Sequence, residues 1–128
     1  DEREILNMPN IQTAQPFNDL SIDKFILLEA IPNDETSFDI SFKIKSSDTT
    51  KSSIIRFETV SKFNCYSWDN LEISLGQNEN EFNSFDMQFN VPNIRHSSDQ
   101  IQIYIDNDNE VEIQIKDLRI KSTSLLRK

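Results

Sequence analysis

Hydrophobic and polar residues alternate in several runs along the chain beyond residue 36. In residues 37–45 every even position is apolar and every odd position is polar. Successive side chains of a β-strand point to opposite faces, so this alternation predicts a strand with one buried face. The same alternation recurs in residues 53–59, 85–91, 101–105 and 111–120. The pattern therefore predicts a chain built from strands.

The middle of the chain contains two less regular apolar segments, residues 63–68 and 71–75. We expect them to form a hairpin that turns at Asp69-Asn70, because these residue types tolerate the positive φ angles of tight turns. Cys65, the only cysteine, is expected on the core face of the first segment, since free cysteine is among the most often buried residues.

The ends of the chain are expected to be less ordered than its middle. Pro9 and Pro16 interrupt regular elements, so residues 1–20 are predicted to be irregular. Residues 122–128 are predicted to form a flexible tail. Residues 21–31 are ambiguous: Ile22, Phe25 and Ile26 lie at helical spacing behind a possible Ser21 cap. The run is short and ends at Pro32, so we favour a strand over residues 25–31.

These segments together amount to about seven to nine short strands with connections rich in Asn, Asp and Ser. Strands of parallel sheets are usually continuous apolar runs joined by helices, whereas half-buried antiparallel strands alternate. The sequence therefore predicts one all-β domain over residues 1–128, an antiparallel two-sheet sandwich of jelly-roll type.

Charge narrows the choice of partner. The chain carries 22 acidic and 13 basic residues, a net charge of −9. Such a field repels a polyanion, so nucleic acid is excluded as a partner, while a neutral ligand or a cation is favoured. No stretch approaches the roughly 20 apolar residues that a membrane span needs, so no membrane insertion is expected within this chain.

The residues that most catalytic sites require are scarce. Gly76 is the only glycine, which excludes loops that cradle phosphate. His96 is the only histidine, and a nucleophile needs a base beside it. One cysteine and one histidine cannot supply a usual structural zinc site. Acidic residues for glycoside hydrolysis are present, but no pair is marked out. We therefore expect no enzyme and no required cofactor.

Calcium is the one metal for which the chain offers candidate ligands. Asp106 and Asp108 lie in a run of five Asp, Asn and Glu residues, and oxygen ligands at alternate positions suit Ca²⁺. The run lies between two alternating strands, so a hairpin turn accounts for the same residues, and we favour the turn.

Three segments of the C-terminal third carry a resemblance to a known family. They are residues 85–92 (FDMQFNVP), 99–107 (DQIQIYIDN) and 111–120 (VEIQIKDLRI). This pattern resembles exported jelly-roll domains of Bacteroidetes, which are similar to carbohydrate-binding modules. The resemblance implies a non-catalytic, glycan-binding module of an exported bacterial protein, with an extracellular, cell-surface or periplasmic location. In related domains an Asp at the position of Asp117 helps to hold a structural Ca²⁺, so Asp117 joins Asp106 and Asp108 as a possible ligand.

A glycan-binding face needs aromatic rings for the apolar faces of sugars and planar polar groups for the hydroxyls. The residues of these types that alternation places away from the core are Tyr66, Trp68, Tyr104, Gln102 and Arg56. A sandwich exposes one face of each sheet to water, and this exposure alone accounts for the same polar residues without any ligand. The alternative is therefore a structural or protein-interaction ectodomain or appendage of a larger surface or membrane protein, which contacts other domains of its parent and binds no sugar.

Overall fold

A computed structural model describes residues 2–21, 26–27, 35–48, 50–60, 65–74, 80–91, 94 and 99–124. Its regular elements are all strands: β1 (Glu2–Met8), β2 (Gln12–Ala14), β3 (Leu20–Ser21), β4 (Ile26–Leu27), β5 (Thr36–Ser46), β6 (Ser52–Val60), β7 (Cys65–Ser74), β8 (Asn83–Val91), β9 (Gln100–Asp106) and β10 (Ile113–Ser124). The described part of the chain holds no helix of the length and apolar character needed to cross a membrane.

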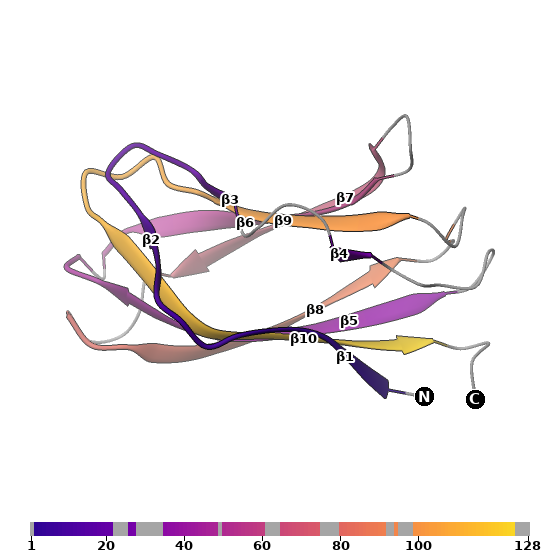
Figure 1. Cartoon of the computed structure of the whole chain (residues 1–128). Helices are drawn as coiled ribbons and strands as arrows, with labels where there is room; N and C mark the ends of the chain where they lie inside the picture. Colours follow the sequence, from indigo (N-terminus) through magenta and orange to yellow (C-terminus); the bar gives the residue numbers. More distant parts are fainter. Residues whose placement is uncertain are drawn as a thin grey trace.

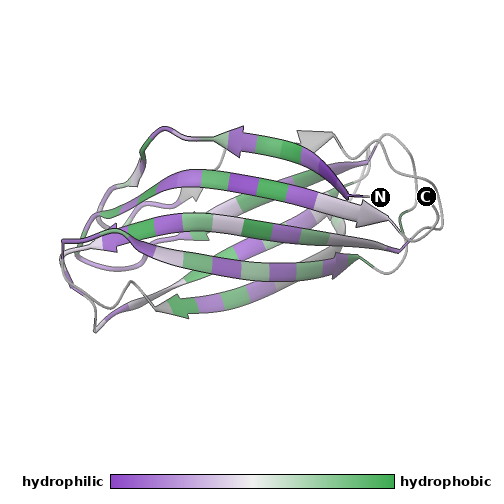
Figure 2. Ribbon diagram, turned by 90° about the horizontal axis from the view of Figure 1, so that it is seen from below, coloured by the Kyte–Doolittle hydropathy of each residue, from purple (hydrophilic) through white to green (hydrophobic). Residues whose placement is uncertain are grey.

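The strands form two antiparallel sheets that face each other (Figure 1). The first sheet has the order β1-β10-β5-β8, and β2 also pairs with β10. The second sheet has the order β3-β9-β6-β7, and β4 also pairs with β9. Figure 2 shows hydrophobic and hydrophilic residues alternating along the strands, as the sequence predicts. The prediction of an all-β, two-sheet sandwich is confirmed.

The core lies between the two sheets. Phe57 of the second sheet contacts two rings of the first: its centroid lies 5.2 Å from that of Phe38 and 4.7 Å from that of Phe89. Aliphatic side chains from inward positions of both sheets surround these rings, namely Ile40, Ile44, Ile55, Ile73, Ile101, Ile103, Ile105, Ile113, Ile115, Leu118 and Ile120. The burial of these apolar surfaces stabilises the sandwich and fixes the register of each strand, because a shift by one residue would expose them.

The N-terminal segment is more regular than predicted. Residues 2–8 and 12–14 form strands β1 and β2, so the expectation of an irregular segment was wrong there. Pro9 lies between the two strands and separates them without preventing either. β1 lacks alternation because it is an edge strand, held on β10 by backbone pairing from Glu2↔Thr123 to Met8↔Leu118. β10 extends to Ser124, so the first part of the predicted tail is also strand, and residues 125–128 lie outside the described part.

The predicted hairpin at Asp69-Asn70 is absent, because β7 continues through both residues. β6 offers β7 an uninterrupted partner from Ser52↔Ser74 to Thr59↔Ser67, and this pairing outweighs the local turn preference. The irregularity lies instead at Tyr66, where the register changes to Val60↔Cys65. Cys65 is exposed, so its expected place in the core was also wrong. Of the strand predicted at residues 25–31, the structure describes only β4.

Candidate ligand-binding surface

The outward face of the second sheet gathers most of the residues predicted to bind a ligand. On β6 and β9 the odd-numbered residues from Ile55 to Thr59 and from Ile101 to Ile105 are buried, so the even-numbered side chains point outward. The strand register aligns these in two neighbouring rows across β9, β6 and β7, which are Tyr104–Arg56–Asn70 and Gln102–Glu58–Trp68. For Trp68 this placement concerns the backbone, since its side chain lies outside the described part of the structure. Tyr66 belongs to neither row, because it lies at the irregularity in the pairing of β7 with β6, and its side chain is also outside the described part.

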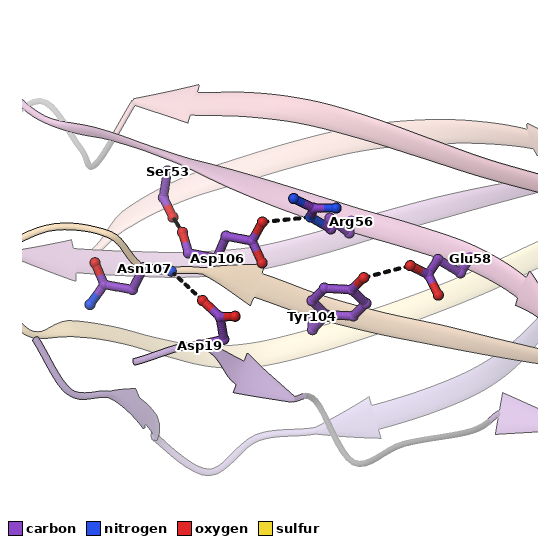
Figure 3. A network of polar contacts seen from close by, with 7 residues as sticks. All are labelled: Asp19, Ser53, Arg56, Glu58, Tyr104, Asp106 and Asn107. Carbon is purple, nitrogen blue, oxygen red and sulfur yellow. Dashed lines mark hydrogen bonds and ion pairs between the residues drawn. The ribbon is translucent and has the colours of Figure 1, made fainter. Parts of the chain in front are cut away.

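An ion pair fixes Arg56 above the sheet. Its Nε donates a hydrogen bond to Oδ2 of Asp106 at 2.5 Å, and the Asp106 side chain is only 12% exposed (Figure 3). The hydrogen bond to Asp106, together with the charge of that carboxylate, raises the pKa of Arg56 above its usual value. The guanidinium carbon lies 5.9 Å from the ring centroid of Tyr104, a cation–π contact. Arg56 therefore stays charged and is held against the aromatic ring.

The phenol of Tyr104 is fixed from its other end. Its hydroxyl donates to Oε1 of Glu58 at 2.5 Å, as Figure 3 shows. This hydrogen bond, then partial burial and the negative charge of Glu58, raise the pKa of Tyr104 to about 12. The four side chains thus form one chain of contacts, Asp106–Arg56–Tyr104–Glu58, which we call the Tyr104 network. The Tyr104 phenol is therefore neutral at physiological pH, and its contacts with Arg56 and Glu58 set the orientation of its ring.

A buried asparagine anchors the end of β9 that carries Asp106. Asn107 is fully buried, and its Nδ2 donates to the carbonyls of Gln15 at 3.0 Å and Val111 at 3.1 Å. Its Oδ1 accepts from the backbone N–H of Asn109 at 3.1 Å, and its own N–H donates to Oδ1 of Asp19 at 3.2 Å. The hydroxyl of Ser53 donates to the Asp106 carbonyl. Sequence analysis did not identify Asn107, because its only signal was a polar run that predicted a turn.

The predicted calcium ligands are not brought together. Asp106 contacts Arg56 in the second sheet, whereas Asp117 lies in β10 of the first sheet, 3.5 Å from Nζ of Lys43. Asp108 is exposed in the connection between β9 and β10. Within the described ranges, no three His, Cys, Asp or Glu side chains are placed to share a metal ion. Asp117 has a φ of 53° and occupies the irregularity in the pairing of β10 with β5.

The outward face of the first sheet contains two hollows that sequence analysis did not find. One has a volume of about 570 Å³ and is lined by Asp39, Ser41, Asp86, Gln88, Arg119 and Lys121, among others. The second, of about 430 Å³, also includes Ser41, Asp86 and Arg119 and continues to Lys43, Ser84 and Asp117. Because the two share three lining residues, they form one trough along β5.

No protein-family model and no curated protein matches the sequence. Among solved structures, the chain is similar to one described as "CBM4 structure and function", with a TM-score of 0.53 and 14% identity, over 95% of this chain and 78% of that one. It is also similar to a "Family 16 Carbohydrate Binding Module-2", with a TM-score of 0.48 and 11% identity, over 84% of this chain and 73% of that one. At these identities the likeness concerns the fold: the chain has a β-sandwich like that of carbohydrate-binding modules.

Proposed function

We propose that the chain is a non-catalytic glycan-binding module that binds sugar on the outward face of the second sheet. The Tyr104 network carries this proposal. An aromatic ring that is already oriented by Arg56 and Glu58 loses little conformational freedom when a ligand arrives, which favours binding. The β-sandwich fold shared with a solved carbohydrate-binding module supports the same class of function.

The chemistry of this face suits a polyhydroxylated ligand. The ring of Tyr104 would contact the C–H groups on one face of a sugar, while Gln102 offers both a donor and an acceptor for hydroxyls. Glu58 accepts from Tyr104 through Oε1, so its Oε2 would accept from a sugar hydroxyl. The backbone of Trp68 lies opposite that of Glu58, and Trp68 would extend the binding strip towards β7.

We further propose that the module belongs to an exported bacterial protein and acts outside the cytoplasm. The resemblance of residues 85–92, 99–107 and 111–120 to exported jelly-roll domains supports this location. In such a setting the sandwich would hold a parent protein on a polysaccharide, and the network would supply contact with the sugar while performing no chemistry.

Tryptophan fluorescence during titration with a panel of neutral glycans tests the proposal. Trp68 is the only tryptophan, so any change in emission comes from this one residue. We expect at least one glycan to shift or quench the emission, and Tyr104→Ala to weaken that binding by about tenfold, a loss of about 1.4 kcal/mol.

Tyr104→Phe, which keeps the ring and removes the hydroxyl that bonds Glu58, should weaken binding less than Tyr104→Ala does. Gln88→Ala, on the outward face of the first sheet, is the matched control and should leave the affinity unchanged. If no glycan alters the emission and the chemical shifts of the Tyr104 network stay constant, the result would instead support a structural or protein-interaction domain.

A further inference from the structure

Two lysines converge on one phenylalanine ring at the edge of the first sheet. Nζ of Lys116 lies 4.2 Å, and Nζ of Lys45 5.0 Å, from the ring centroid of Phe82. Lys45 belongs to β5, Lys116 to β10, and Phe82 immediately precedes β8. All three side chains are partly exposed, so a ligand can reach them.

A third lysine lies beside this pair. The register of β10 with β5 sets Lys116 directly opposite Lys43, and like charges in that position repel each other. Lys43 has a carboxylate partner, Asp117, at 3.5 Å. Both Lys45 and Lys116 contact the Phe82 ring, and neither side chain forms an ion pair or a hydrogen bond with another residue that the structure describes.

Such a convergence of two lysines on one ring is unusual in a chain with so many acidic residues. The chain has 22 acidic residues against 13 basic ones, so carboxylate partners are plentiful elsewhere on its surface. Of the acids near Phe82, Asp117 contacts Lys43, and Glu112, which lines a small hollow with Lys45, accepts a hydrogen bond from Gln114 at 2.9 Å. Glu81, next to Phe82 in the sequence, is exposed and forms no ion pair with Lys45 or Lys116. Among the residues that the structure describes, the ammonium groups of Lys45 and Lys116 therefore have no carboxylate in an ion pair and can attract an external anion.

The surface next to these lysines is shaped and polar. Lys43 lines the hollow of about 430 Å³, whose lining also includes the neutral polar side chains of Asn7, Ser41 and Ser84 and the charged side chains of Asp86, Asp117 and Arg119. Hydroxyl and amide groups of this kind form hydrogen bonds with the hydroxyls of a neutral, hydrated ligand. An anionic group held at Phe82 could thus continue into a polyhydroxylated part that lies in the hollow.

We propose that Phe82, Lys45 and Lys116 form a second binding site, on the sheet opposite the Tyr104 network, for an acidic saccharide. Its carboxylate or sulfate accepts charge-assisted hydrogen bonds from the two ammonium groups, and its ring carbons contact Phe82. The hollow beside Lys43 receives the neighbouring sugar. The inference depends on the proposed function only in taking the ligand to be a saccharide, because the anion preference follows from the lysines themselves.

Two-dimensional ¹⁵N-amide NMR titration tests this site, because it reports on both sheets at once. The probes are an oligogalacturonate, a sulfated neutral oligosaccharide, the same oligosaccharide without sulfate, and inorganic sulfate. We expect at least one of the two acidic saccharides to shift the amide signals of residues 43–45, 82–84 and 114–117. The acidic saccharide that binds more tightly shows whether the site prefers carboxylate or sulfate.

Variants separate this site from general charge attraction. Lys45→Ala and Lys116→Ala should each weaken binding of the acidic saccharide by about tenfold, the effect of losing one charge-assisted hydrogen bond of about 1.4 kcal/mol. Lys51→Ala changes the net charge equally at an exposed position outside the cluster and is the matched control. Phe82→Leu keeps an apolar side chain and should weaken the saccharide more than it weakens inorganic sulfate.

The outcomes for the two sites are distinguishable. Shifts near Phe82 with acidic probes alone would support this inference even if no neutral glycan altered Trp68 emission. Shifts confined to the Tyr104 network would overturn the inference and leave the proposed function intact. A loss of affinity in Lys51→Ala equal to that in Lys45→Ala would overturn it as well, and so would inorganic sulfate that binds as tightly as the saccharides.

Discussion

Replacing Asn107 with alanine should destabilise the sandwich more than any exposed polar substitution. The variant removes the amide that joins residues 14–15 to Asn109 and Val111 in the connection between β9 and β10. Three carbonyls, together with the backbone N–H and the side-chain amide of Asn109, would lose this partner, and Asn107 itself is 0% exposed. The sequence separation of 92 residues between Asn107 and Gln15 means that the N-terminal segment would lose a direct tie to the end of β9.

The magnitude follows from counting these bonds. The three shortest side-chain hydrogen bonds of Asn107, at 3.0, 3.1 and 3.1 Å, each contribute about 1 kcal/mol net, and groups left unsatisfied cost more. The segments are partly accessible, so water would replace some of the lost partners. We therefore expect a loss of about 2–4 kcal/mol in the free energy of unfolding and a fall of roughly 10 °C in Tm.

Urea unfolding followed by far-UV circular dichroism measures this loss. The matched control is Asn18→Ala, because Asn18 lies nearby in the sequence of the same N-terminal segment, is exposed, and donates its amide to the carbonyl of Pro16 at 3.2 Å. The control should change the free energy of unfolding by less than about 0.5 kcal/mol. A loss below about 1 kcal/mol in Asn107→Ala, similar to that of the control, would refute the assignment of Asn107 as the anchor of this region.

Three other predictions concern titration, backbone strain and metal. Absorbance titration should find the Tyr104 phenol ionising near pH 12. Because the pKa of this phenol is higher in the folded state than its unfolded value of about 10, the phenol contributes its full stabilisation below about pH 10. That stabilisation is lost as the pH rises through about 12. Glu58→Gln should bring the pKa of Tyr104 back towards 10, and an unchanged titration would contradict the hydrogen bond. The φ of 53° at Asp117 suits glycine and disfavours a β-branched residue. In urea unfolding, Asp117→Gly should therefore preserve the free energy of unfolding, and Asp117→Val should lower it by about 1–2 kcal/mol. Equal effects of the two substitutions would exclude backbone strain at this position. Thermal melting with and without EDTA should give the same Tm, because Asp106 and Asp117 lie in different sheets; a lower Tm with EDTA would reveal a structural cation.

Alternation was sufficient to locate the strands that have one buried face and one wet face. It identified residues in β5, β6, β8, β9 and β10, because each of these strands contributes a row of side chains to the core. It could not identify β1, where an edge position and ion pairs such as Arg119–Glu4, at 2.8 Å, replace burial. It misjudged β7 because a turn preference at Asp69-Asn70 is local, whereas the pairing that overrides it comes from a different segment of the chain.

The sequence allowed individual residues of the candidate site to be predicted, but it did not show which of them lie side by side. Arg56, Gln102 and Tyr104 could be selected because they occupy outward positions of alternating segments. Their grouping depends on the register Arg56↔Tyr104, which joins residues 48 positions apart and leaves no trace in either segment alone. Asn107 and Phe82 lie outside the alternating runs, so their roles become visible only when the strands that surround them are placed in space.

The pairing of β1 with β10 also determines how the sandwich would respond to a pulling force. Glu2 lies opposite Thr123 in an antiparallel pair, so the beginning of β1 and the end of β10 lie at the same end of the sheet (Figure 1). A force that pulls these two points apart acts on the hydrogen bonds of the pair one after another, beginning with the outermost, and never on all of them together. The ion pairs Lys121–Glu2 and Arg119–Glu4 would break early in that sequence. A module tethered through both of these points would therefore unzip at low force, whereas one tethered through a single point would carry no tension across the fold and would stay closed.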